Sequence, residues 1–492
     1  MNIRVNHNSI APIYMQIAAQ MKSLILSGEM VAGCILPSER SLAHMLGVHR
    51  NTVARAYAEL KAEELIESRQ GYGYVVSLPE KENAAEVPRI RKKKVHWPEL
   101  IKDEYLDMEV AFDDVFQRFS DERLISLGSG ISTSEVYDRH KVSAEIAGLI
   151  AEGGKDQYFY NPYQGDKRLR HKLVSFLSTK GIKAGMSEIQ ILTETNQALD
   201  FLVALLLRPG DTVIMEEPVS PDAFRAVELA GGRVVTVPVD GDGMQCDCLE
   251  ELILLHKPRF IYVNSSFHDP TGVILSGQRR QRLMEISEAY RIPVVEDDAA
   301  SELVYSGPKP LPIKASDTQN NVIYIYSFSL TFLPGLSLAV VVADKELIRS
   351  LSYLVSVRLV ATDWMSQKLI AGYLDDGRYY RNLHVFRSNY AIKQEVMCRE
   401  LDKMKPLGLE YVRPRGGVYI WCRLPEGVDS MELEVEARRM GVSIVPGYVF
   451  YPGKSGGRNY IRLNFSYESR ERIRQGLELL RLAIETQLAQ KK

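Results

Sequence analysis

The chain has 492 residues, which exceeds one ordinary hydrophobic core, so we expect two or three domains. Its 45% hydrophobic and 25% charged content is typical of a soluble globular protein, and its net charge of -2 gives no overall attraction to nucleic acid. Any DNA-binding surface must therefore be local. The five scattered cysteines form no disulfide or metal framework, and no apolar run approaches the roughly 18 residues of a membrane span. We expect a cytoplasmic protein with no membrane contact.

Apolar periodicity predicts three helices near the N-terminus. Residues 13–25 carry apolar side chains at helical spacing along one face. Residues 38–47 predict a second helix, capped by Ser38 and ended by Gly47. Its inward-facing side chains are expected to be Leu42, Met45 and Leu46. A third helix is expected to begin near residues 49–50, after a tight turn.

A small hairpin is predicted directly after these helices, because residues 67–76 alternate in polarity and contain Gly71 and Gly73. Two short helices joined by a tight turn and followed by such a hairpin form a winged helix-turn-helix, whose second helix can enter the major groove of DNA. A single copy touches few phosphates, so useful affinity at physiological salt requires two copies, and we expect a homodimer.

The same segment resembles the GntR family of winged-helix regulators. Residues 36–43, Leu-Pro-Ser-Glu-Arg-Ser-Leu-Ala, and residues 47–53, Gly-Val-His-Arg-Asn-Thr-Val, follow the family pattern except at His49, where serine is usual. The resemblance implies double-stranded operator DNA as a partner. The residues that it places against DNA are Arg40, Arg50, Asn51, Thr52, Arg55 and Arg69. The alternative is a helical interaction module on which these charges are merely solvated.

Residues 78–118 are charged and contain isolated prolines, which predicts a linker that buries little surface. The basic run at residues 89–94 is either a solvated segment or a supplementary nonspecific DNA contact. The expected domains are therefore a DNA-binding domain at 1–77, the linker, and an effector and dimerisation domain at 119–492.

In the larger domain, predicted helices alternate with apolar strands at 190–193, 212–215, 233–237, 260–263, 293–296, 322–326 and 338–342. This alternation predicts βαβ units around a mostly parallel central sheet. We expect a large part at about 145–345 and a small C-terminal part at about 346–492. In such sheets ligands bind at the carboxyl ends of the strands.

Several loops at these strand ends resemble those of fold-type I aminotransferases, in the family's order along the chain. They are residues 160–170, 209–218, 269–272, 296–298, 327–339, 416–421 and 461–465. The resemblance implies an α/β aminotransferase-like domain and pyridoxal 5'-phosphate as the family cofactor.

The residues that would hold this cofactor depart from the family pattern. Leu330 stands in the place of the Schiff-base lysine, and Ser337 in that of the phosphate-binding arginine. Glu194 stands where a small residue adjoins the phosphate, which its carboxylate would repel. Asp269 replaces an asparagine that binds the phenolic oxygen. Without an amine at position 330 we expect no covalent cofactor and no catalysis, while noncovalent binding stays open.

Other groups of the pattern are kept. Asp297 can face a pyridinium nitrogen, Arg462 can face a carboxylate, and Ser327 and Ser329 retain their hydroxyls. Together with Tyr160 they complete the expected ligand pocket. The alternative is a buried network in which Arg462 pairs with Asp297, Asp298 or Asp269.

A GntR-like winged helix before an aminotransferase-like domain is the arrangement of MocR-type bacterial regulators. The resemblance implies a cytoplasmic, head-to-tail dimeric transcription factor that senses a small carboxylate or an amino-acid-like effector. Two alternatives remain at this stage: an aminotransferase-like enzyme with an appended DNA-binding domain, and a regulator that binds pyridoxal phosphate noncovalently. A pure dimerisation scaffold is also open.

Overall fold

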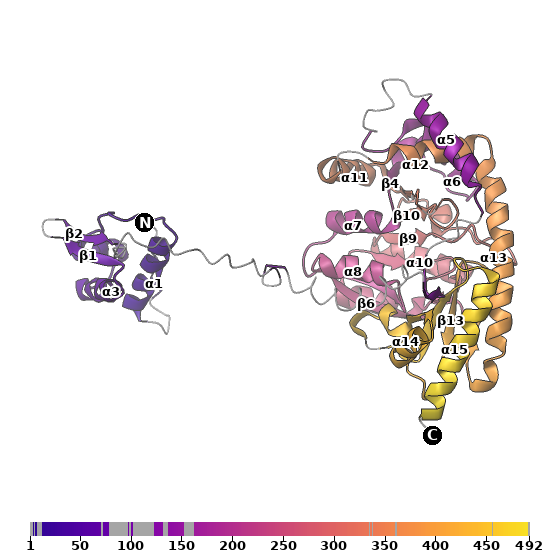
Figure 1. Ribbon diagram of the computed structural model, residues 1–492. Helices are drawn as coiled ribbons and strands as arrows, with labels where there is room; N and C mark the ends of the chain where they lie inside the picture. The colour runs from indigo at the N-terminus through magenta and orange to yellow at the C-terminus, as the bar shows by residue number, and fades with distance from the viewer. Residues whose placement is uncertain are drawn as a thin grey trace. The chain divides into compact units, whose positions relative to one another are not determined.

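The computed structural model describes residues 3, 5–6, 12–69, 72–77, 97, 100–101, 123–130, 136–151, 162–333, 335–336, 338–359, 362–454 and 456–490. Contacts divide the chain into two compact units, Met1–Trp97 and Pro98–Lys492, each of which has its own fold (Figure 1). The linker predicted at 78–118, with its basic run, lies almost entirely outside the described residues.

The first unit is a winged helix-turn-helix, as predicted. Its elements in chain order are α1 (Ile13–Leu26), α2 (Glu39–Leu46), α3 (Arg50–Ala62), β1 (Ile66–Arg69) and β2 (Gly73–Val76). The two strands pair antiparallel and form the wing, and α3 packs against both α1 and α2. Its core includes the fully buried side chains of Ile17, Met21, Val53, Ala56 and Tyr57.

The turn between α2 and α3 is built by local signals in the sequence. The Ser38 hydroxyl accepts a hydrogen bond from the Ser41 backbone N–H at 3.2 Å and caps α2. Gly47 ends that helix with φ of 63°, a left-handed conformation that glycine adopts without strain. His49 caps α3 through its Nδ1, which accepts from the Asn51 N–H at 3.2 Å. One prediction was wrong here: Met45 is 59% exposed, because it lies on the solvent side of α2.

The second unit contains a mostly parallel eight-stranded sheet, which confirms the predicted fold class. The strand order is β4-β11-β10-β9-β8-β5-β6-β7, and only β11 and β7 run antiparallel to their neighbours among the described strands. The strands are β4 (Ile189–Leu192), β5 (Thr212–Glu217), β6 (Arg233–Asp240), β7 (Gly243–Met244), β8 (Ile261–Val263), β9 (Val294–Asp298), β10 (Val322–Ser327) and β11 (Ala339–Val342).

Helices cover both faces of this sheet (Figure 1). On one face, α7 (Thr195–Leu206), α8 (Pro221–Leu229) and α11 (Lys345–Arg358) share an apolar core with the sheet. The opposite face packs against α6 (Lys167–Ser178), α9 (Leu249–His256) and α10 (Gly277–Tyr290). Two further helices, α5 (Arg139–Ala151) and α12 (Trp364–Asp375), contact one another beside α6.

Strand alternation decides which polar residues reach which face. Asp297 on β9 lies opposite Ile325 of β10 in the register, so Asp297 and Ser327 point to the face covered by α7 and α8. Asp298 and Tyr324 point to the other face. The expected ligand residues on these two strands therefore lie on one side of the sheet.

The C-terminal part forms a smaller layer. An antiparallel sheet joins β12 (Glu410–Tyr411), β13 (Tyr419–Arg423), β16 (Tyr460–Asn464) and β15 (Val445–Pro446) in that order. It is accompanied by α13 (Arg378–Asp402), α14 (Ser430–Arg439) and α15 (Arg470–Gln490). Figure 1 shows α13 and α15 side by side, and many of their residues are in contact. The early strand β3 (Ile125–Ser126) pairs with β14 (Val442–Ser443), so the start of this unit belongs with its end.

The paired glycines of the 416–421 segment are required by packing. A Cβ atom on Gly416 would lie 2.2 Å from the Phe267 ring, and Gly417 has φ of 71°. Trp421 stacks on Tyr460 with ring centres 5.1 Å apart. Among the helices in the described ranges, none is long and apolar enough to cross a membrane.

Candidate functional site

The first candidate surface is the exposed side of α3 and the wing. Arg40, Arg50, Asn51, Arg55 and Arg69 are exposed, and Thr52 is half-buried. All six residues predicted to face DNA are thus described: Arg40 lies on α2, Arg69 on the wing and the other four on α3. Exposed cations next to a helix N-terminus provide the electrostatics that phosphates require.

Three of these arginines already have partners within the unit. Arg50 Nε donates to Glu39 Oε2 at 3.0 Å, and the Arg69 Nε donates to Glu67. The Arg55 guanidinium stacks over the Tyr14 ring, 3.9 Å from its centre. Arg50 and Arg55 therefore have different surroundings. Arg50 must leave or share Glu39 before it can neutralise a phosphate.

The second candidate site lies at the carboxyl ends of β8, β9 and β10. Tyr262 donates its hydroxyl hydrogen to Asp297 Oδ2 at 2.8 Å. Asp297 is only 8% exposed, and its Oδ1 is buried with no hydrogen-bond partner among the described residues. Burial raises the pKa of Asp297 to about 7; the Tyr262 hydrogen bond opposes this rise, and Asp298, Asp269 and Glu216 add to it.

Asn264 joins Asp297 to the segment that carries Asp269. Its amide Nδ2 donates to the Asp297 carbonyl at 3.3 Å, and its Oδ1 accepts from the Asp269 backbone N–H at 3.3 Å. The Asn264 backbone N–H in turn donates to Glu216 Oε2 at 2.6 Å. This chain of contacts holds the carboxylates of Glu216, Asp269 and Asp297 in one neighbourhood.

Arg462 on β16 is paired within the protein. Its Nη1 contacts Asp269 Oδ1 at 2.9 Å and Oδ2 at 3.0 Å, and its Nη2 donates to the Gly128 carbonyl at 3.1 Å. The guanidinium also lies over the Tyr419 ring at 4.2 Å. Of the two interpretations drawn from the sequence, the contacts match the buried network, with Asp269 as the partner.

Glu194 lies directly before α7 and next to the serines of the 327–339 loop. Ser327 Oγ is 3.5 Å from Glu194 Oε2, and it shares a hydrogen bond of 2.7 Å with Ser329 Oγ. Burial raises the pKa of Glu194, although the Thr195 N–H and the Ser327 hydroxyl lower it. The two hydroxyls expected to bind a phosphate are therefore beside a carboxylate.

Asp222, at the start of α8, belongs to the same group of residues and was missed by the sequence interpretation. Asn196 Nδ2 donates to Asp222 Oδ2 at 3.1 Å, which connects α8 to the first turn of α7. Burial raises the pKa of Asp222 and Asp269 adds to the rise, whereas Asn196, Arg225 and Arg462 lower it. In the sequence, its position at the start of a helix that follows a strand could have indicated a site residue.

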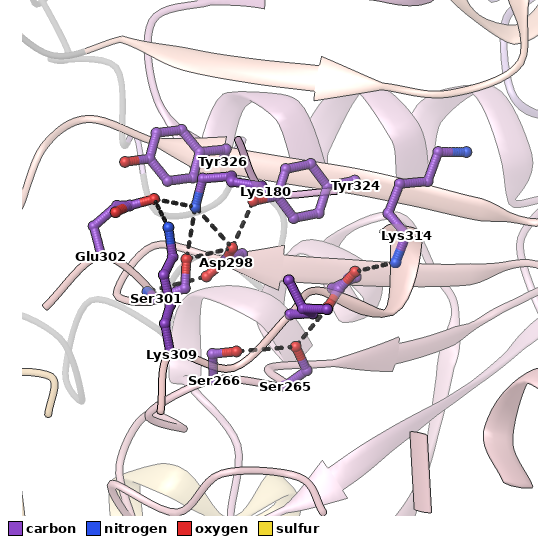
Figure 2. Close-up of polar contacts among 12 residues, drawn as sticks. Lys180, Ser265, Ser266, Asp298, Ser301, Glu302, Lys309, Lys314, Tyr324 and Tyr326 are labelled. Atoms are coloured by element: carbon purple, nitrogen blue, oxygen red, sulfur yellow. Dashed lines mark hydrogen bonds and ion pairs between the residues drawn. The ribbon is translucent and has the colours of Figure 1, made fainter. Parts of the chain in front are cut away.

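Leu330 is 7% exposed and packs within the largest apolar cluster, so position 330 contributes no amine to the site. Lys180, Lys309 and Lys314 are engaged elsewhere (Figure 2). Lys180 is fully buried and contacts Glu302 at 2.7 Å and Asp298 at 3.6 Å, on the face of the sheet opposite Asp297. Lys309 pairs with Glu302 and Lys314 with Asp317. Tyr160 and Ser337, two members of the expected pocket, lie outside the described residues.

Comparisons with known proteins define the class. The aminotransferase class I and II family matches residues 122–480, and the chain belongs to it. The family of bacterial regulatory proteins named gntR matches residues 13–76, where the winged helix lies. The chain thus joins a GntR winged helix to a class I and II aminotransferase domain.

Individual relatives share this arrangement. The chain is 29% identical over 482 residues, 96% of each protein, to the uncharacterized HTH-type transcriptional regulator YdfD of Bacillus subtilis. It is 26% identical over 452 residues to the probable rhizopine catabolism regulatory protein MocR of Rhizobium meliloti, covering 90% of this chain and 88% of that one. MocR-type regulators are therefore homologues over nearly the whole chain.

A solved enzyme shares the fold of the larger unit. Kynurenine aminotransferase of Pyrococcus horikoshii is 29% identical, with a TM-score of 0.74 over 80% of this chain and 99% of that one. The family depends on pyridoxal phosphate, and the residues found here fit that cofactor poorly. Asp297 Oδ1 suits a pyridinium nitrogen, but Glu194 adjoins the phosphate hydroxyls and Leu330 offers no amine.

Proposed function

We propose that the chain is a sequence-specific DNA-binding transcriptional regulator of the MocR type, acting in the cytoplasm where the DNA is. The observation that carries this proposal is that one chain joins a winged helix-turn-helix with exposed arginines to an aminotransferase domain. The whole-length similarity to YdfD and MocR supports it. In this proposal residues 1–77 bind DNA, 78–118 link, and 119–492 sense a small molecule and dimerise.

We further propose that the aminotransferase-like domain forms no Schiff base and is not an enzyme. Leu330 occupies the position of the lysine in the family pattern, and a buried leucine supplies neither a covalent anchor nor a proton carrier. Fold-type I aminotransferases are usually dimers, so the same domain is proposed to form a head-to-tail homodimer that presents two winged helices.

DNA binding is tested by selecting sequences from random double-stranded DNA with the full-length protein and then measuring affinity against salt concentration. We expect one enriched sequence and a linear fall of log affinity with log salt. Arg40→Ala should weaken binding to all sequences and reduce the salt slope by about 1. Arg168→Ala, an exposed arginine in the other unit, is the matched control. Equal enrichment of all sequences would refute sequence-specific regulation.

The state of the cofactor site is tested by titration with pyridoxal phosphate, followed by borohydride reduction and mass spectrometry. We expect no cofactor mass on the wild-type protein. Leu330→Lys tests whether an amine at this position is sufficient for Schiff-base formation. A new absorbance band together with a trapped adduct would show that it is. An adduct on the wild-type protein would contradict the proposal and identify the lysine responsible.

Noncovalent binding of pyridoxal phosphate is the second candidate. Asp297 Oδ1 favours it, because this oxygen has no hydrogen-bond partner among the described residues. It predicts a spectral change on titration without a borohydride-trapped adduct. Asp297→Asn would weaken that binding, because an amide cannot offer a negative oxygen to a pyridinium nitrogen.

A further inference from the structure

Among the described residues, the expected cofactor site carries more negative than positive charge. The carboxylates of Glu194, Asp222, Asp269 and Asp297 lie around the ends of β9 and β10, the loop after β8 and the starts of α7 and α8. One of them, Asp269, is matched by Arg462 through contacts of 2.9 and 3.0 Å. The other three have hydrogen bonds to neutral groups.

These three carboxylates belong to one group of neighbouring residues. Glu194 accepts from the Ser327 hydroxyl at 3.5 Å, and two residues further along the chain Asn196 donates to Asp222 at 3.1 Å. Asp222 interacts electrostatically with Asp269, which Asn264 joins to Asp297. One cluster therefore runs from the serines of the loop to Asp297.

Arg462 and Arg225, the described arginines that interact with this cluster, both already have acidic partners. Arg462 contacts Asp269 through Nη1 and the Gly128 carbonyl through Nη2, and it also interacts with Asp222; its Nε has no hydrogen-bond partner among the described residues. Arg225 on α8 interacts with Asp222, but it interacts with Glu228 as well. Lys180 is on the opposite face of the sheet with Glu302 and Asp298 (Figure 2). An added anion would meet uncompensated carboxylates, whereas an added cation would be attracted by them.

An independent observation points to a missing ligand. Asp297 is more than nine-tenths buried, yet its Oδ1 has no hydrogen-bond donor among the described residues. Its Oδ2 is bonded to Tyr262 and its backbone carbonyl to Asn264, so the free oxygen is the only acceptor of this residue left open there. A buried carboxylate oxygen without a donor is costly, and a ligand N–H would satisfy it.

We propose that this site binds a small organic cation bearing an amine, noncovalently, with Asp297, Asp222 and Glu194 as its anionic partners. This inference rests on the proposed sensor role and narrows the expected effector, a small carboxylate or an amino-acid-like molecule, to an amine without a carboxylate, because Asp269 already neutralises Arg462. An organic cation is favoured over a metal ion, since the described residues contain no group of three or more metal-ligating side chains arranged to hold one.

The test compares three four-carbon probes that differ in charge: putrescine, butanediol and succinate. Each is titrated into the full-length protein, with calorimetry and the unfolding temperature as readouts. We expect putrescine to bind and to raise the unfolding temperature, and the other two to do neither. Asp222→Asn, Asp297→Asn and Glu194→Gln should each weaken putrescine binding by about tenfold or more, which corresponds to the loss of one charge interaction.

Asp200→Asn is the matched control, because Asp200 is an exposed acid on α7 and pairs with Arg358 away from the cluster. Tighter binding of succinate than of putrescine would overturn the proposal. So would putrescine affinity that none of the three substitutions changes. If one of the three variants does not fold, the remaining two still test the proposal. DNA binding measured without any probe tests the proposed regulator function separately. Failure of the amine proposal can therefore be told apart from failure of the regulator proposal.

Discussion

Arg462 Nη1 contacts both carboxylate oxygens of Asp269, at 2.9 and 3.0 Å, although 193 residues separate the two in the chain. Arg462 is 4% exposed, so its charge is largely removed from water and depends on this partner. The pair joins β16 of the C-terminal part to the loop after β8. It also limits what else Arg462 can bind, because Asp269 uses Nη1 and the Gly128 carbonyl uses Nη2, which leaves only Nε without a partner among the described residues.

Asp269→Asn is expected to release Arg462 for a ligand carboxylate. The amide keeps the size of the side chain and one acceptor oxygen but removes the negative charge. We expect succinate to bind the wild-type protein too weakly to detect. Its affinity for the variant should be at least about tenfold above that detection limit. Calorimetry measures this directly, and Asp200→Asn controls for the loss of one acidic residue. Unchanged affinity for succinate would show that Arg462 is inaccessible to ligands.

Glu302 makes stability depend on pH in the acid range. Burial alone would raise its pKa, but Lys180 and Lys309 outweigh burial and bring the pKa to about 2, from an ordinary value of 4.5. Because the folded-state pKa is lowered, Glu302 contributes fully to the free energy of unfolding above pH 4.5, and this contribution is lost as the pH falls toward 2. The contribution is about 3 kcal/mol near neutral pH. Urea unfolding should show the difference between wild type and Glu302→Gln shrinking to about 1 kcal/mol by about pH 3.

Asp297 has the opposite effect. Its pKa is raised from 3.8 to about 7, chiefly by burial, so the folded protein keeps this proton over a range in which the unfolded chain has lost it. The contribution of Asp297 to the free energy of unfolding is fully present below pH 3.8. It is lost as the pH rises through about 7, a decrease of about 4 kcal/mol. Relative to Asp297→Asn, the wild-type protein should become less stable over this range. Tyr262, Asp298, Asp269 and Glu216 also influence the pKa of Asp297. If stability had the same pH slope in both proteins, these neighbours would be responsible for it.

Local features of the sequence predicted the helices and strands. The contacts within the candidate ligand site depend on side chains that pair between different elements. Ser38 and Gly47 are helix signals that act within a few residues, and the structure has both as predicted. Met45 was misplaced because the helical period alone does not say where the apolar stripe ends. The sequence interpretation offered Asp269 as one of three alternative partners for Arg462, but spacing could not choose among them, nor could it reveal the Asn196–Asp222 contact between two helices. Asp222 had no assigned role until α7 and α8 were side by side.

Glu39→Gln is expected to strengthen binding to DNA of any sequence. Glu39 Oε2 accepts from Arg50 at 3.0 Å and its Oε1 lies 3.5 Å from the Tyr74 hydroxyl, so this carboxylate partly neutralises the arginine at the start of α3. An uncharged amide frees that charge for a phosphate, which should raise the salt slope by about 1. Affinity against salt, measured on specific and random duplexes, tests this. Glu59→Gln removes the same charge from exposed α3 and is the control; an equal gain there would mean that Arg50 was never restrained by Glu39.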